Sequence, residues 1–140
     1  MILRLKELIN DSNDKVEDLM NYLQIKDVSQ IYQWIRGDNN PNADNLVKIA
    51  IYFNCSIDYL VGRTENNDKF PSTLTSSFAE RLQEIMKNKN VTQYKMIKEN
   101  VVSGINFHRW FKLKAVPQLD TLIKLADYFG VSIDYLVGRE

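Results

Sequence analysis

The sequence has few of the residues from which catalytic and metal sites are usually built. Its 140 residues include one histidine and one cysteine, and five glycines leave little room for a phosphate-cradling glycine loop. Cys55 has no second cysteine with which to form an internal disulfide. No metal-ligand cluster or nucleophile–base pair is recognisable. We therefore expect neither an enzyme nor a cofactor or metal ion.

Long apolar segments are also missing. No apolar run approaches the ~20 residues needed to cross a bilayer. Met1 opens directly into Ile2-Leu3-Arg4-Leu5, without the pattern of a signal peptide. With 44% hydrophobic and 26% charged residues, the composition is that of an ordinary globular protein. These observations predict a cytoplasmic protein that has no membrane partner.

Net charge is absent as well, which taken alone argues against a nucleic-acid partner. The zero total conceals an asymmetry, because residues 1–70 carry 8 Lys/Arg and 11 Asp/Glu, whereas residues 71–140 carry 10 and 7. Between Lys87 and Lys114 there are seven basic residues and one acidic residue, Glu99. A phosphate-binding face is therefore expected to be stronger in the second half.

The sequence contains an internal repeat, which decides its architecture. Residues 53–63 (FNCSIDYLVGR) recur as residues 129–139 (FGVSIDYLVGR), at an offset of 76 residues. The same offset pairs Trp34 with Trp110, while nearer the N-terminus the offset becomes 77. One copy has therefore gained or lost a residue between its first helix and its tryptophan.

The segment between the copies is polar and contains a proline, which is typical of a linker. We predict a first domain at residues 1–63, a linker at residues 64–74 and a second domain at residues 75–140.

Apolar residues recur at helical spacing in both copies, which predicts an all-α fold with five helices in each copy. Ser77 with Glu80 and Asp27 with Gln30 match the capping box that starts a helix. The helices of copy one are expected at residues 2–10, 15–23, 28–36, 43–53 and 57–61. Those of copy two are expected at 77–88, 92–99, 103–112 and 119–129, with N-caps at Thr92 and Ser103, and a fifth helix capped by Ser132 that ends near Gly138.

The second and third helices of copy two are separated by only a few residues, which is typical of a helix-turn-helix. Phe107 and Trp110 in copy two, and Ile31 and Trp34 in copy one, have the spacing of a core-facing pair. Asn and Gln side chains can bond to adenine edges and Arg to guanine. The side chains left outside are Asn106, His108, Arg109 and Lys112 in copy two, and Ser29, Gln30, Tyr32, Gln33 and Arg36 in copy one.

Several motifs occur at matching places in the two copies. Copy two has Thr92-Gln93, Ser103, residues 107–110 (FHRW) and residues 117–122 (PQLDTL). Copy one has Asp27, residues 31–34 (IYQW), residues 41–46 (PNADNL) and residues 56–60 (SIDYL). In this combination both copies resemble the Cro-like, lambda-repressor-like helix-turn-helix family, also called the xenobiotic-response-element family.

The resemblance implies two tandem lambda-repressor-like domains that bind double-stranded DNA, each with its third helix in the major groove. It places Gln93 on a phosphate. The base-reading positions that it implies are Gly104, Asn106, His108 and Arg109 in copy two, and Val28, Gln30, Tyr32 and Gln33 in copy one. Arg36, Lys112 and Lys114 complete the predicted DNA-binding set.

Copy one departs from the family pattern. It has Lys15-Val16 where the family has Thr-Gln, and Lys26 is expected as an extra residue in its turn. The family often has glycine in this turn, where we place Gln24 in copy one and Val101 in copy two.

The cysteine, the tryptophans and the histidine are expected to have structural or surface positions rather than catalytic or metal-binding roles. Cys55 aligns with Val131 and is expected to be buried. The two tryptophans are expected in the core rather than as stacking platforms for bases. His108 has no partners for a metal or catalytic role and is expected on the outer surface. Tyr32 stays open between a base contact, a phosphate contact and a protein interface.

We predict a transcriptional repressor or activator of bacterial or phage-derived origin that associates with the nucleoid. Two readers in one chain allow either a homodimer or a single-chain pseudo-dimer on one asymmetric site. The alternative is that domain 1 is a protein-interaction module, for dimerisation or for an antirepressor or toxin partner, and that only domain 2 binds DNA.

Overall fold

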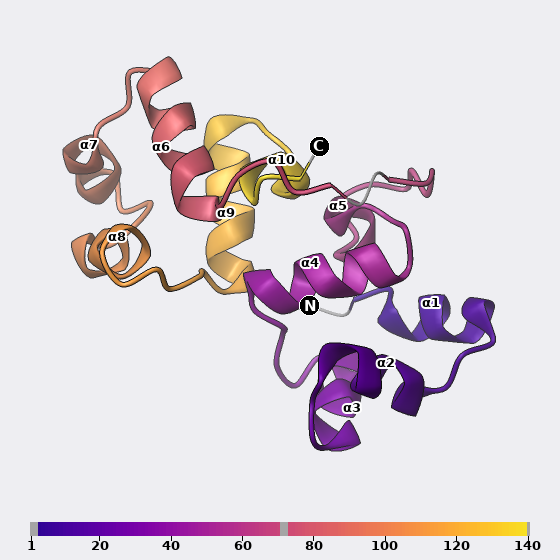
Figure 1. Cartoon of the computed structure of the whole chain (residues 1–140). Coiled ribbons are helices and arrows are strands. Elements are labelled where there is room, and N and C mark those ends of the chain that lie inside the picture. Colours follow the sequence, from indigo (N-terminus) through magenta and orange to yellow (C-terminus); the bar gives the residue numbers. More distant parts are fainter. Residues whose placement is uncertain (1–2, 71–72, 140) are drawn as a thin grey trace. The chain divides into compact units, whose positions relative to one another are not determined.

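The computed structural model describes residues 3–70 and 73–139, and in that part of the chain it contains ten helices and no strand (Figure 1). The helices form two compact units, Met1–Ser72 and Thr73–Glu140, with five helices in each. The all-α prediction is confirmed. Parts of our predictions that concern Met1, Ile2, Pro71, Ser72 and Glu140 lie outside the described residues.

The helix bounds follow the predicted ones closely, except in the first helix of the chain. The first unit contains α1 (Leu5–Ser12), α2 (Val16–Leu23), α3 (Val28–Arg36), α4 (Ala43–Tyr52) and α5 (Ile57–Leu60). The second contains α6 (Phe78–Asn88), α7 (Gln93–Lys98), α8 (Gly104–Phe111), α9 (Leu119–Phe129) and α10 (Ile133–Leu136). The clearest difference is α1, which begins and ends later than the predicted 2–10, with Asn13 in the left-handed conformation as its C-cap.

Polar residues cap most of these helices where the sequence predicts it. The Ser77 hydroxyl accepts from the Glu80 N–H and the Glu80 carboxylate accepts from the Ser77 N–H, which forms the expected capping box. These hydrogen bonds lower the pKa of Glu80. The box predicted for Asp27 is wrong, because the Asp27 carboxylate accepts instead from the N–H of Ser29. The short Asp27 side chain reaches the nearer N–H of Ser29, and this hydrogen bond does not involve the Gln30 side chain.

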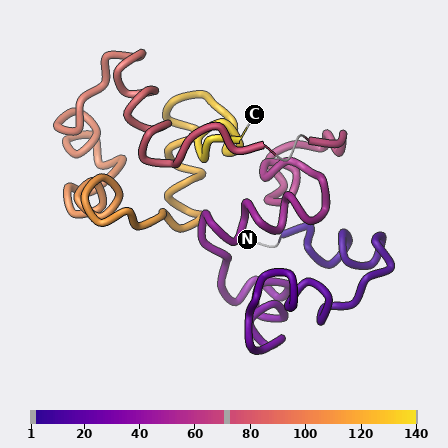
Figure 2. Tube along the Cα trace, in the orientation of Figure 1, coloured from indigo at the N-terminus to yellow at the C-terminus, as the bar shows by residue number. Residues whose placement is uncertain are grey.

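Each unit has its tryptophan in the core. Trp34 and Trp110 are both buried, as predicted, and so is Cys55. The ring of Trp110 packs edge-on against Phe78 at 5.2 Å and against Phe107 at 5.8 Å, so α8 is held against α6. The opposite side of α8 is left free to face outward. Within the second unit, α7 and α8 lie beside each other (Figure 2), and α10 contacts both α6 and α9.

An arginine at the start of the first helix holds the last helix of each unit. The Arg4 Nη1 donates to the carbonyl oxygen of Tyr59 at 3.0 Å, and its guanidinium lies 4.1 Å from the centre of the Tyr59 ring. Arg81 makes the same two contacts with Tyr135, at 2.8 Å and 4.1 Å. The hydrogen bond and the cation–π contact together fix a short helix that could not form on its own.

The end of the second unit is more deeply enclosed than the equivalent part of the first. Arg139 and Asp134 form a fully buried ion pair at 2.8 Å, whereas the related pair Arg63–Asp58, at 3.1 Å, is partly exposed. The N–H of Thr75 donates to the carbonyl oxygen of Gly138 at 2.8 Å, which brings the segment before α6 across the chain end. This cover explains the deeper burial of the second ion pair.

Equivalent tyrosines tie the fourth helix to different ends of the second helix. In the first unit the Tyr52 hydroxyl donates to the carboxylate of Asp14, just before α2, at 2.6 Å. In the second unit Tyr128 interacts with Glu99, the residue that follows α7. The Asp14 carboxylate raises the pKa of Tyr52 to about 12, and burial together with the Glu99 carboxylate raises the pKa of Tyr128.

Replacing Gly138 should destabilise the second unit strongly. Gly138 has a φ of +91°, and an added Cβ would lie 2.0 Å from the carbonyl oxygen of Ser76. Strain and clash together predict that Gly138→Ala lowers the free energy of unfolding by about 3 kcal/mol or more. Urea unfolding followed by Trp110 fluorescence, in a Trp34→Phe background, measures this.

The matched control is Gly62→Ala in the first unit. Its φ of +84° is similar, but nothing lies within 4 Å of an added Cβ, so only the strain of about 1–2 kcal/mol is expected. Trp34 fluorescence in a Trp110→Phe background reports it. Equal losses at the two glycines would contradict the close approach at Ser76.

Tyr52 should titrate well above an ordinary tyrosine. The Asp14 carboxylate accepts its hydrogen bond and raises the pKa of Tyr52 to about 12, from an ordinary value of 10.0. Because the protonated phenol is favoured in the folded state, this tie stabilises the first unit below about pH 10 and is lost as the pH rises toward 12. Phenolate absorbance checks this: the late titration should vanish in Tyr52→Phe and move down in Asp14→Asn. An unchanged curve for Asp14→Asn would show that Asp14 is not the cause.

Candidate nucleic-acid interface

Measured from its left-handed residue to the next N-cap, the turn between the second and third helices has the same length in both units. The left-handed residue is Gln24, the C-cap of α2, with a φ of +59°, and Asn100, which follows the C-cap of α7, with a φ of +60°. In both units the N-cap of the next helix, Asp27 or Ser103, follows three residues later. Asn100 is therefore the counterpart of Gln24, and the prediction that placed Val101 there and an extra Lys26 in the turn is wrong. The additional residue lies before the turn, because Gln24 follows the N-cap of α2, Lys15, by nine positions (24 − 15), whereas Asn100 follows the N-cap of α7, Thr92, by eight (100 − 92).

The outer face of α8 carries polar, basic and apolar side chains. Phe107 and Trp110 are buried, while His108, Arg109 and Lys112 are exposed, as predicted. Ile105 belongs to the same exposed face, with 61% of its surface accessible, and our sequence analysis missed it. Ile105 lies four residues before Arg109, and this helical spacing is the signal in the sequence that places both residues on one face.

A hollow of about 310 Å³ brings four predicted residues of the second unit together. Gln93, the first residue of α7, lines it with Gly104 and His108 of α8 and with Lys112, the C-cap of α8. The start of α7 has no acidic residue in its first turn, and all four of these residues are exposed. Helix N-termini and basic side chains both favour anions, so this arrangement suits a phosphate group.

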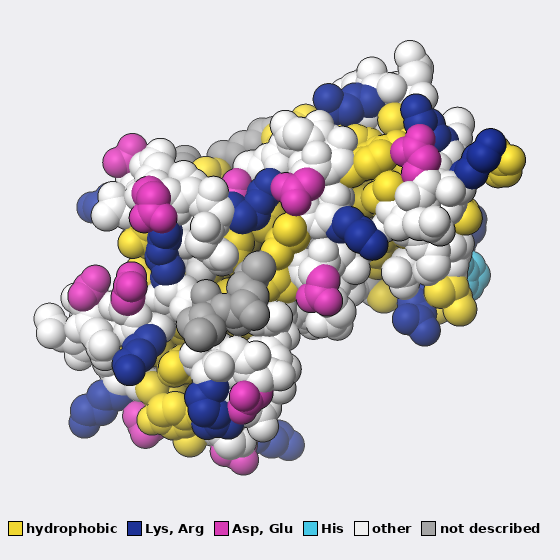
Figure 3. All heavy atoms as spheres, turned by 180° about the vertical axis from the view of Figure 1, so that it is seen from behind, with side chains coloured by type: hydrophobic (Ala, Val, Ile, Leu, Met, Phe, Trp, Pro, Cys, Tyr) yellow, Lys and Arg dark blue, Asp and Glu magenta, His cyan; other side chains and the backbone are white. Residues whose placement is uncertain are grey.

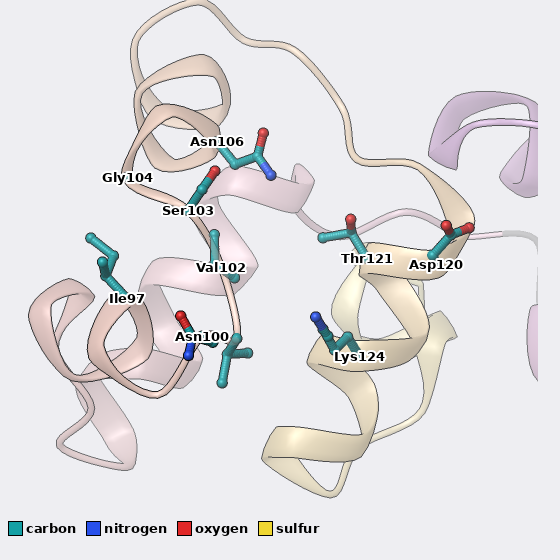
Figure 4. Close-up of a pocket in the computed structure, with 10 residues that line it drawn as sticks. Ile97, Asn100, Val102, Ser103, Gly104, Asn106, Asp120, Thr121 and Lys124 are labelled. Atoms are coloured by element: carbon teal, nitrogen blue, oxygen red, sulfur yellow. The ribbon is translucent and has the colours of Figure 1, made fainter.

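Asn106 is separated from that group. It is half-buried and lines a different cavity, of about 560 Å³, between the turn before α8 and the first half of α9. In Figure 4 the Asn106 and Lys124 side chains point into this space from opposite sides, whereas the Asp120 carboxylate points away. Lys114, also predicted, is exposed in the segment that follows α8. The structure therefore does not bring Asn106 and Lys114 into one group with Gln93.

In the first unit, two of the predicted DNA-binding residues interact with neighbouring side chains. Gln30, Tyr32 and Arg36 are exposed, but Arg36 forms an ion pair with Asp38 at 2.9 Å. Gln33 is half-buried, and its Oε1 accepts from the Asn39 Nδ2 at 2.8 Å. An exposed pair of this kind contributes ~1 kcal/mol or less, so it holds Arg36 only loosely.

Acidic residues surround the equivalent surface of the first unit. At the start of α2, the Asp18 carboxylate accepts from the N–H of Lys15 at 2.8 Å, and Glu17 is also in the first turn. Negative charge at this helix start would repel an incoming phosphate. On the second unit, Figure 3 shows the histidine (cyan) at the edge, with Lys and Arg side chains (dark blue) near it. Helix α8 itself contains no acidic residue.

Within residues 3–70 and 73–139, no group of three or more His, Cys, Asp or Glu side chains comes together in a way that could hold a metal ion. None of the helices in those ranges is both long enough and apolar enough to span a bilayer.

Comparison with known proteins supports a helix-turn-helix at the N-terminal side. Residues 5–60 match the helix-turn-helix family model and form a helix-turn-helix domain. A stretch of 63 residues, 45% of this chain, is 32% identical to the HTH-type transcriptional activator BcrR of Enterococcus faecalis, of which it covers 31%. The chain therefore spans about a third of the length of this relative. No solved structure matches. The family match falls on the copy that departs further from the family pattern in its second helix.

The caps of α7 and α8 should differ in their contribution to stability. The Thr92 hydroxyl accepts from the N–H of Lys95 at 3.1 Å, whereas the Ser103 side chain makes no hydrogen bond to the start of α8, although Ser103 occupies the predicted N-cap position. Thr92→Ala should cost about 1 kcal/mol, and Ser103→Ala should stay within about 0.5 kcal/mol. Urea unfolding with Trp110 fluorescence compares the two. A larger cost at Ser103 would contradict the uncapped geometry.

Proposed function

We propose that this chain is a DNA-binding transcriptional regulator with two helix-turn-helix domains in tandem, residues 1–63 and 75–140, joined by residues 64–74. The family match at residues 5–60 and the transcriptional activator among its relatives support the first part. The second domain repeats the helix order of the first and the arginine contact of its last helix. Such a regulator acts at the nucleoid in the cytoplasm.

The second domain makes the stronger contact with DNA in this proposal. The observation that carries it is the group formed by Gln93, Gly104, His108 and Lys112 around one hollow, with Arg109 exposed beside it. Gln93 and Lys112 bind phosphates, and α8 enters the major groove, where Arg109 can reach a guanine edge. Lys114 adds a further phosphate contact after α8.

The two domains present different surfaces, so a single chain bound as a pseudo-dimer prefers an asymmetric site. Gln30 and Tyr32 of α3 stand where Asn106 and His108 stand on α8. Paired half-sites read by equivalent helices are spaced by about one helical turn of DNA, ~34 Å. A homodimer of chains is the other assembly that the tandem permits.

Removing Arg109 should weaken binding. Arg109 is exposed on α8, and a good arginine–base contact is worth about 1–3 kcal/mol. Arg109→Ala should therefore raise the Kd by roughly tenfold to a hundredfold on a duplex selected with the full chain. Fluorescence anisotropy at several salt concentrations measures it. Lys6→Ala, which removes an exposed cation on α1, is the control and should leave the Kd nearly unchanged.

The second candidate function is that domain 1 binds a protein and only domain 2 binds DNA. Two observations favour it. Arg36 is paired with Asp38 and Gln33 with Asn39 within the unit, and the start of α2 is acidic. Gln33→Ala combined with Arg36→Ala separates the two: a weaker complex supports two DNA-reading domains, and an unchanged Kd supports the protein-binding role. If neither this pair nor Arg109→Ala alters the Kd, the proposed mode of DNA binding is wrong.

A further inference from the structure

Ile105 is the apolar side chain most prominent on the outer face of α8. It is 61% exposed, although its helix neighbours Phe107 and Trp110 are buried. The preceding residue, Gly104, has no side chain and lines the hollow formed with Gln93, His108 and Lys112. The fold does not require an apolar residue here, because the equivalent residue in the first unit is Ser29, which is also exposed.

The surroundings of Ile105 are basic. Arg109 lies one turn further along the same face, His108 and Lys112 are exposed beside it, and α8 contains no acidic residue. A protein interface usually excludes charge from its apolar centre. The floor of the DNA major groove fits better, because it offers the 5-methyl groups of pyrimidines between two rows of phosphates.

We propose that Ile105 reads a pyrimidine 5-methyl group in the major groove and so sets part of the sequence preference of the second unit. This inference rests on the proposed DNA binding of that unit. Thymine carries the methyl group in ordinary DNA, and 5-methylcytosine presents the same group at the same place. A rigid, β-branched side chain is suited to this contact because few of its rotamers are lost on binding.

The size of the effect follows from the area that one methyl group buries. A methyl-sized group transferred from water to an apolar contact contributes about 0.8 kcal/mol, which corresponds to roughly a fourfold change in Kd. Ser29 offers no equivalent contact, so the methyl preference should occur in one half of the bound site only.

The test begins with a duplex selected from random DNA by the full chain. Each thymine is then replaced singly by deoxyuridine, which removes only the 5-methyl group, and the Kd is measured for the natural chain and for Ile105→Ser. At one or two positions the natural chain should lose about three- to tenfold in affinity, while Ile105→Ser should lose nothing further. Placing 5-methylcytosine opposite guanine at such a position should restore part of the loss, which separates methyl reading from reading of the thymine O4.

Leu113→Ser is the matched control, because Leu113 is similarly exposed, at 64%, but lies beyond the end of α8. It should keep the full sensitivity to deoxyuridine. The inference is overturned if the natural chain ignores deoxyuridine at every position, or if Ile105→Ser retains the same sensitivity. A change in sedimentation of Ile105→Ser without a change in methyl sensitivity would place Ile105 in a protein interface instead. If no duplex is enriched at all, the proposed function itself fails.

Discussion

The contact between an arginine at the start of each unit and its last helix is the constraint on which the rest of each unit depends. A helix of four residues, such as α5 or α10, has too few internal hydrogen bonds to persist alone. Arg4 and Arg81 satisfy a carbonyl of that helix and cover a tyrosine ring, which joins the two ends of the unit. With the ends joined behind the core, the second and third helices remain at the surface, where a nucleic acid can be reached.

The two units share this scaffold and differ in the side chains that it exposes. The buried tryptophan, the serine caps of α5 and α10 and the arginine contacts recur in both units. At the surface, Arg36 is paired with Asp38, whereas Arg109 and Lys112 face outward on an acid-free helix. Core residues are constrained by close packing and exposed residues are not, which is why a duplicated domain diverges first on its outer face. The family match at residues 5–60 accordingly reports on the scaffold more than on the strength of DNA binding.

Local signals predicted the helices well, because capping and hydrophobic spacing act over a few residues. Ser77 with Glu80, the N-cap Thr92 and the span Leu119–Phe129 were all found from sequence. Where these predictions failed, competing local geometries were close in energy. Asp27 bonds to the N–H of Ser29 rather than forming a box with Gln30. The extra residue of copy one is absorbed between the N-cap of α2 and the turn, because a longer helix disturbs the turn less than an insertion in it.

The sequence by itself predicted an all-helical fold with Trp34 and Trp110 buried, and it contains a visible internal repeat, because periodicity and repetition are properties of sequence order. Tertiary structure alone decided which predicted residues lie together. It placed Gln93 beside His108 and Lys112, turned Asn106 toward α9, and paired Gln33 with Asn39. It also exposed Ile105, the second residue of α8. These arrangements depend on how neighbouring helices pack. Packing brings residues from different helices together, and no local sequence pattern encodes it.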